Sequence, residues 1–306
     1  MTSILSALLW AWLMASSFLV SAFIVPFASP MATTGLRFLF ALIIMTPFYL
    51  AQSRPSESTL RSLIRSPVFV LKYLFISGSL VGFFIGLFTA LKSTTSLNTS
   101  VIYTLVPLIG ALIMLGVGIR TPLKHWVGYV LGTAGAITVL IFSRDGHLAW
   151  HSGDAIYVVA CVLLALHVVS VQVWGSNASP FEGAYRITLF GSLWLWPIMI
   201  FWGDLTNVRW YSREFWLLLS YLTLFTTLIT FVLQQMVVKQ SGASRLLAFS
   251  YTIPIWVSLY FASHTASLTE ELSLGFVIGA LMVLIALVLI DNSLLFRNTS
   301  NGSTST

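Results

Sequence analysis

Apolar residues run along this chain in ten long segments separated by short polar breaks. Each segment is close to the ~20 residues that a helix needs to cross the hydrocarbon core of a bilayer. The breaks carry turn or charge signals, such as Ser29-Pro30, Ser179-Pro180 and Gly203-Asp204. The pattern predicts ten membrane-spanning helices, at residues 4–27, 31–50, 70–90, 96–118, 124–142, 154–174, 180–202, 215–238, 243–263 and 271–291.

The two halves of the chain repeat each other faintly. At a constant shift of 147 residues, the first-half positions Lys92, Pro107, Gly128 and Gly132 recur as Lys239, Pro254, Gly275 and Gly279. Pro30 and Pro47 recur at a shift of 150 residues as Pro180 and Pro197. With five spans per half, the second half must cross the membrane in the opposite sense to the first, which is an inverted repeat. The sequence therefore predicts two inverted five-helix repeats, at residues 1–145 and 146–295, and a disordered cytoplasmic tail at residues 296–306.

Composition agrees with an integral membrane protein. Hydrophobic residues make up 58% of the chain and charged residues 8%, and the mean hydropathy is +0.93. A net charge of +6 would suggest nucleic-acid binding in a soluble chain. Here most basic residues fall in loops, so we expect a lipid bilayer and no nucleic acid as partner. The single cysteine, Cys161, excludes an intrachain disulfide and a metal site built from cysteines.

The distribution of basic residues predicts the orientation. Residues 1–36 carry no charged side chain, so the basic region of a cleaved signal peptide is missing and the first span is expected to be retained. With the N-terminus inside, ten Lys and Arg residues face the cytoplasm and five face outward. The positive-inside rule then favours two cytoplasmic termini.

The prolines and glycines at repeated positions are expected to bend helices and to let helices pack closely. Pro107 and Pro254 each lie near the middle of a span, where they bend the helix and either shape a central cavity or make a simple packing kink. The small-residue spacings Gly128-x3-Gly132-x2-Gly135 and Gly275-x3-Gly279 predict close helix contacts, within the chain or in a homodimer.

Polar side chains gather on one face of the eighth span. Its residues at i, i+3, i+4, i+7 and i+11 are Thr223, Thr226, Thr227, Thr230 and Gln234. This stripe is predicted to line the substrate pathway. The alternative is a set of hydrogen bonds to neighbouring helices.

Charged and titratable groups are rare inside the spans. His167 is the candidate for proton coupling, and a neutral histidine bonded to a carbonyl is the alternative. No Asp or Glu lies at a span centre, and Asp154, Glu182 and Asp291 each lie within a turn of a span end, so we expect weak or absent proton coupling. Arg37 and Arg186 lie a turn or two inside their spans. If they face the cavity they favour a carboxylate or phosphate on the substrate, and if they reach the interface they are anchors.

These features resemble the EamA-type, ten-helix branch of the drug/metabolite transporter superfamily. The resemblance rests on Trp12-x3-Ser16-Ser17-Phe18, on Pro30 with Arg37, and on the repeated lysine, proline and glycine positions. It implies a membrane carrier, often an exporter of amino acids and related metabolites, with a cavity between the halves. The predicted substrate pathway comprises Trp12, Ser16, Ser17, Arg37, Tyr103, Pro107, His167, Arg186, Thr223, Thr227, Thr230, Gln234, Tyr251 and Pro254.

The sequence thus predicts a secondary transporter that moves small polar or amphipathic metabolites, such as amino acids, outward across the cell inner membrane. It is expected to act as a monomer or homodimer, with no cofactor and no metal. A carrier for sugars, nucleotide sugars or phosphorylated metabolites is the alternative within transport. A membrane-embedded enzyme lacks its usual residues, because the chain shows no nucleophile elbow, P-loop or paired intramembrane aspartates. A structural or receptor role is the remaining alternative.

Overall fold

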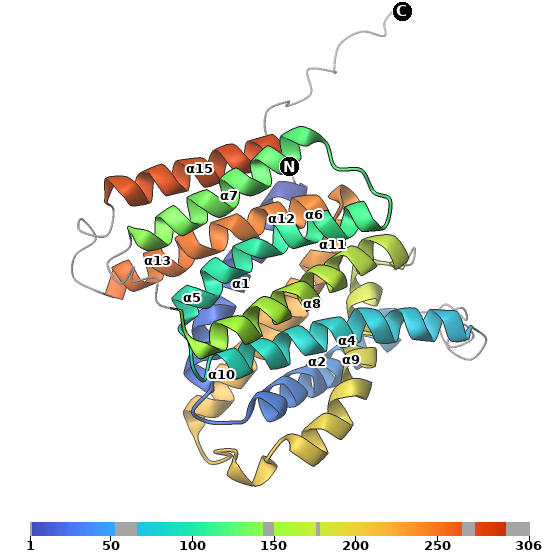
Figure 1. Ribbon diagram of the computed structural model, residues 1–306. Coiled ribbons are helices and arrows are strands. Elements are labelled where there is room, and N and C mark those ends of the chain that lie inside the picture. The colour runs from blue at the N-terminus through green and yellow to red at the C-terminus, as the bar shows by residue number, and fades with distance from the viewer. Residues whose placement is uncertain (1, 53–65, 143–149, 176–177, 265–272, 292–306) are drawn as a thin grey trace, which may run out of the picture.

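The structure of the protein is a computed structural model that describes residues 2–52, 66–142, 150–175, 178–264 and 273–291. Within these ranges all regular elements are helices, and most of them lie side by side with similar directions in one bundle (Figure 1). The polar segment 53–65 and the tail expected at residues 296–306 lie outside the described residues.

The first half of the chain supplies five spans, of which the fourth is interrupted. Its elements are α1 (Thr2–Ile24), α2 (Pro30–Gln52), α4 (Pro67–Ala90), α5 (Ser96–Ile102) with the 3-10 turn η1 (Tyr103–Leu105) and α6 (Val106–Gly116), and α7 (Leu123–Ile141).

The second half follows the same order, with interruptions in its third and fourth spans. Its elements are α8 (Ser152–Trp174), α9 (Pro180–Trp202), the short η2 (Leu205–Asn207), α10 (Arg213–Thr223) with the π-helix η3 (Leu224–Ile229) and α11 (Thr230–Ser241), α12 (Ala243–Phe249) with the 3-10 turn η4 (Ser250–Thr252) and α13 (Ile253–His264), and α15 (Leu274–Ile290).

Eight helical segments are long and apolar enough to cross a membrane. The helices α7 and α15, which pack against each other, complete the ten spans. The prediction of an all-helical membrane fold with ten spans in two halves is confirmed.

The two ends of the bundle are named by the residues that lie there. The "near end" is the end with the start of α1, Trp174, Ser241 and Asp291. "Far end" means the opposite end, with Ile24, Leu91, His151 and Gly203.

Serine caps explain where several of these helices begin. The hydroxyls of Ser66 and Ser179 accept hydrogen bonds from the backbone N–H groups of Phe69 and Glu182, at 3.3 and 3.2 Å. A proline follows each serine at the first position of the helix, where its missing N–H is not needed. The sequence signals Ser-Pro therefore mark true helix starts.

The two prolines of the repeat interrupt their spans in the same way. The 3-10 turn η1 ends two residues before Pro107, and η4 ends two residues before Pro254. The turns are offset by 147 residues (250 − 103 = 147), which is the shift seen in the sequence. Because a proline cannot donate the next helical hydrogen bond, each span tightens into a 3-10 turn and restarts at the proline.

The halves pack across an approximate two-fold axis. The helix α2 packs on its repeat counterpart α9, and α7 packs on its counterpart α15 (Figure 1). Further contacts come in matched pairs, since α4 packs on α8 as α11 packs on α1, and α6 packs on α8 as α13 packs on α1. This exchange of equivalent contacts is what an inverted repeat produces.

Glycines bring α7 and α15 into backbone contact. A Cβ on Gly135 would lie 2.8 Å from the carbonyl oxygen of Gly279, and one on Gly279 would lie 2.7 Å from the carbonyl oxygen of Gly135. The small-residue spacing therefore serves packing between the two halves, as small residues commonly do in membrane helices.

We expect Gly279→Ala to destabilise the fold by about 1–3 kcal/mol, the usual cost of overpacking. The added methyl group would meet backbone atoms of α7, which cannot move aside as a side chain can. The measurement is the apparent melting temperature in detergent, followed by circular dichroism. Gly116→Ala is the matched control, because nothing lies within 4 Å of a Cβ there. Equal melting temperatures for the two variants would contradict the close contact.

Candidate functional site

Arg37 of α2 is a fully buried charge whose partners are all neutral. Its Nε donates to the hydroxyl of Thr227, and its Nη2 donates to the carbonyl oxygen and, at 2.9 Å, to the hydroxyl of Thr226. The guanidinium carbon lies 4.2 Å from the ring centroid of Phe84, in cation–π geometry. Nη1 has no hydrogen-bond partner, and among the described residues no carboxylate pairs with this arginine. Arg37 therefore points into the bundle and not toward the interface.

The acceptors that Arg37 uses lie in the π-helix η3. At its end, the backbone N–H of Thr230 bonds to the carbonyl oxygen of Thr227 instead of that of Thr226. The carbonyl oxygen of Thr226 accepts from Arg37 Nη2 and from the Thr230 hydroxyl, at 2.8 Å. Single π turns inside α-helices are frequent at functional sites. The widened turn is thus directly coupled to the buried cation.

The five polar residues of the eighth span are all buried, but they serve different partners. Thr226 and Thr227 bind Arg37, and Gln234 binds His167. Thr230 bonds back to its own helix, whereas the hydroxyl of Thr223 has no partner. Hydrogen bonding within the protein accounts for four of the five residues, which leaves Thr223 available to a ligand.

His167 connects three spans through both of its ring nitrogens. Nδ1 lies 2.7 Å from the carbonyl oxygen of Ile76, and Nε2 lies 2.7 Å from the amide nitrogen of Gln234. A carbonyl can only accept, so Nδ1 carries the proton, and Nε2 accepts from the amide of Gln234. This geometry is that of a neutral histidine bonded to a carbonyl, the alternative considered above.

On α1 the structure separates the predicted pathway residues. Trp12 is 47% exposed on the outer surface of the bundle, whereas Trp10 is 2% exposed and faces inward. The hydroxyl of Ser16 bonds to Leu13 O and receives a bond from Tyr221 of α10, both at 2.8 Å. Ser17 is buried and its hydroxyl has no partner. Of this group, the structure brings Ser17 to the interior and leaves Trp12 outside it.

Arg186 of α9 has an acidic partner, unlike Arg37. Its Nη2 lies 2.5 Å from a carboxylate oxygen of Glu182, one turn earlier on the same helix. The rings of Phe69 and Tyr73 flank the guanidinium. These contacts lie near the start of α9 at the near end, so the two arginines occupy unlike environments.

Tyr103 and Tyr251 lie in different parts of the core. Tyr103 belongs to an aromatic cluster at the centre of the bundle, where its ring centroid lies 5.3 Å from that of Phe18. Tyr251 donates to the backbone carbonyl of Tyr129 in α7 at 2.9 Å. Pro107 and Pro254 are buried at the restarts of their spans. Tyr251 is therefore a packing link to α7.

Two hollows open on the described surface. A groove of about 180 Å³ lies between α2 and α10 and is lined mainly by apolar side chains, with Thr223 at its wall. A polar cavity of about 320 Å³ lies at the near end, between the ends of α6, α8, α11 and α15 and the start of α7. Its lining includes Arg120, His125, Gln172 and Arg245.

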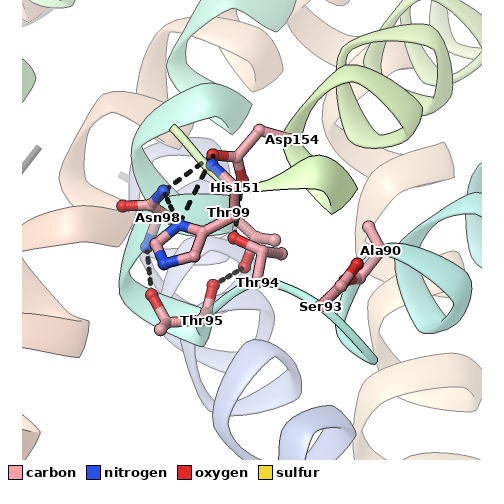
Figure 2. Close-up of polar contacts among 8 residues, drawn as sticks. All are labelled: Ala90, Ser93, Thr94, Thr95, Asn98, Thr99, His151 and Asp154. Carbon is pink, nitrogen blue, oxygen red and sulfur yellow. Dashed lines mark hydrogen bonds and ion pairs between the residues drawn. The ribbon is translucent and has the colours of Figure 1, made fainter. Parts of the chain in front are cut away.

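A buried carboxylate joins the two halves at the far end. Asp154, at the start of α8, is 1% exposed and accepts bonds from the Thr94 hydroxyl at 2.5 Å, from the Asn98 amide at 2.9 Å and from the backbone N–H of His151 at 2.8 Å (Figure 2). His151 also bonds to Asn98, at 3.1 Å. The turn between α4 and α5 thus holds the start of α8 through charge-assisted hydrogen bonds.

Comparisons with known proteins agree with this architecture. A profile described as the EamA-like transporter family matches residues 1–141 and 151–291, which are the two halves of the chain. The chain belongs to the EamA-like transporter family. A solved structure titled only as the crystal structure of a protein is 21% identical, covers 98% of this chain and 97% of its own, and gives a TM-score of 0.71. At that identity the likeness supports the fold alone. No curated protein matches the sequence.

As a member of the EamA-like family, the chain is a multi-pass membrane transporter of the drug/metabolite type. The resemblance stated from the sequence is therefore confirmed.

The pathway predicted from the sequence leaves out three buried residues of this EamA-like protein: Asp154, Trp10 and Ser21. Asp154 stands within a turn of a helix end, where a carboxylate is ordinarily solvated, and it is buried by a turn 60 residues away in the sequence. The spacing of Trp10, Ser17 and Ser21 at i, i+7 and i+11 was a usable signal for Trp10 and Ser21.

We expect Asp154→Asn to lower the free energy of unfolding by about 1–3 kcal/mol, because it removes charge-assisted bonds at a buried site. Denaturation in mixed detergent micelles measures this change. Asp204→Asn is the control, since Asp204 lies at the same end and bonds only to exposed residues of its own turn. A loss for Asp204→Asn as large as that for Asp154→Asn would contradict a special role of the far-end cluster.

We also expect transport to depend weakly on an imposed pH gradient, because His167 is bonded in its neutral form and no carboxylate lies at a span centre. The measurement is uptake into proteoliposomes with and without the gradient. Strong gradient-driven uptake that survives in His167→Ala would show that a different group carries protons.

Proposed function

We propose that this protein exports small amphipathic metabolites, above all amino acids, across the cell inner membrane as a secondary transporter and not as an enzyme. The observation that carries the proposal is the buried Arg37 with neutral partners and one unpartnered amino group. The small molecule itself would supply the missing negative charge.

The physical argument is the cost of a lone charge inside a membrane protein. An ionised group held away from water by neutral partners alone is costly, and intramembrane arginines commonly mark substrate or ion sites. A planar guanidinium binds a carboxylate through paired N–H donors. Arg37 offers its free Nη1 for such a bond, and the cation–π contact with Phe84 helps to hold it when no substrate is bound.

The environment of Arg37 also favours an apolar portion on the substrate. Phe40 and Ile44, on the same face of α2 one and two turns further on, line the groove against α10. Thr223 lines the same groove one turn before the threonines that hold Arg37. A carboxylate at Arg37 would therefore place an apolar side chain toward this groove.

The alternative of a phosphorylated metabolite is less well supported. It requires a strongly positive site, and the second arginine, Arg186, is neutralised by Glu182. One unpaired guanidinium suits one carboxylate better than a doubly charged phosphate.

Export is supported by the predicted orientation. The excess of Lys and Arg favours a cytoplasmic near end. The larger and more polar hollow opens at that end, and its lining includes Arg120 and the ion pair of Arg245 with Asp291, so both signs of charge are present for the entry of a zwitterionic molecule.

We expect Arg37→Gln to reduce L-leucine efflux at least tenfold, because a charge-assisted hydrogen bond is worth about 1.5–3 kcal/mol and 1.4 kcal/mol corresponds to a factor of ten. Arg37→Lys should retain part of the efflux rate, since lysine keeps the positive charge but lacks the paired N–H donors of the guanidinium group. Efflux is measured in cells loaded with a leucine dipeptide that is hydrolysed inside.

Arg209→Gln is the control, because Arg209 is an exposed far-end arginine that also lies over an aromatic ring, that of Phe27. Excess L-leucine should inhibit efflux of labelled leucine in the wild type, whereas leucinamide, which lacks the carboxylate, should not. Full efflux in Arg37→Gln together with loss in Arg186→Gln would overturn the assignment.

A further inference from the structure

One face of α1 carries a line of buried polar groups with no hydrogen-bond partner among the residues that the structure describes. The groups are the indole N–H of Trp10 and the hydroxyls of Ser17 and Ser21, and these residues are 2%, 2% and 0% exposed. Positions i, i+7 and i+11 fall on one side of an α-helix. At 1.5 Å per residue the line is about 16 Å long, or about half the hydrocarbon thickness of a bilayer.

Packing alone does not account for this line. Each buried polar group without a partner costs about 1–3 kcal/mol, and an apolar side chain of similar shape would avoid the cost. The neighbouring Ser16 avoids this cost in the usual way, because its hydroxyl forms hydrogen bonds both within α1 and to Tyr221. Three unpartnered groups on the same face therefore point to a mobile partner.

Two neighbouring helices contribute further groups of the same kind. Ser258 of α13 is 3% exposed, Thr223 at the end of α10 is 2% exposed, and the hydroxyl of neither has a partner. Both helices pack on α1, and so does the π-helix that holds Arg37. The unpartnered groups therefore belong to helices that meet around α1, next to the proposed carboxylate site.

We propose that this face of α1 lines the transport path, and that Trp10, Ser17 and Ser21 successively hydrogen-bond the transported molecule. The inference rests on the proposed function and extends it. The indole N–H can only donate, whereas the serine hydroxyls both donate and accept. The line therefore suits a molecule with donor and acceptor groups beside its carboxylate, such as the ammonium group of an amino acid.

Single cysteines test whether the line meets water. Cys161 is the one native thiol, so Cys161→Ala, checked for normal L-leucine efflux, provides a background without thiols. Ser17→Cys and Ser21→Cys in liposomes should react with a small, charged methanethiosulfonate, supplied on both faces, at least tenfold faster than two controls. The controls are Ser16→Cys, next in sequence but packed on Tyr221, and Trp12→Cys, in the middle of α1 on its exposed outer side.

Saturating L-leucine should slow the labelling of Ser17→Cys and Ser21→Cys at least threefold. Uniformly inert cysteines, in protein that still exports L-leucine, would overturn this inference and leave the proposed function standing. Fast labelling without protection, in protein that exports no amino acid, would show a hydrated path and overturn the proposed substrate class. As a second measurement, Ser17→Ala with Ser21→Ala should raise the KM for L-leucine at least fivefold, and an unchanged KM would also count against the inference.

Discussion

The contact between Arg37 and the π-helix of the eighth span is the interaction on which the centre of this structure depends. A guanidinium deep in a membrane protein needs acceptors, and an uninterrupted α-helix has its carbonyl groups already engaged. The π-helix contains Thr226 and Thr227, and it presents the carbonyl of Thr226 and two threonine hydroxyls to the same arginine side chain. Irregular backbone and buried charge thus stabilise each other. The arrangement ties α2 of the first half to span eight of the second, and it leaves one N–H group of the arginine without a partner.

The two halves are similar in path but different in how they are joined at the two ends. Asn98 and Arg245 occupy equivalent positions, since 98 + 147 = 245. Asn98 bonds across the halves to Asp154, whereas Arg245 bonds to Asp291 of its own half, at 2.6 Å. The far end is therefore held by bonds between the repeats, and the polar cavity lies at the near end. An inverted-repeat transporter alternates between a state open to one side of the membrane and a state open to the other. The difference between the two ends therefore indicates which of these two states the structure represents.

The fold could be predicted from the sequence because span length, repeat spacing and proline positions are properties of short segments. The site could be predicted only in part. Arg37 and the threonines of span eight each stood out, but their contact joins residues about 190 positions apart, and no local pattern reports it. Trp12 was named because it belongs to the motif Trp12-x3-Ser16-Ser17-Phe18, and α1 is so apolar that its hydrophobic residues do not indicate which face is inside. Asp154 was taken for an end residue because burial by the distant α4–α5 turn is a property of the tertiary structure.

The backbone contact between α7 and α15 has a consequence for how such a molecule can move. Side chains can change rotamer and slide past one another, but glycine backbones in direct contact leave no layer between the helices that could deform. The two helices are repeat counterparts and pack on each other across the approximate two-fold axis. The α7–α15 pair should therefore move as one rigid unit. The rearrangements that change which side of the membrane the cavity opens to belong to the helices around α1 and α8.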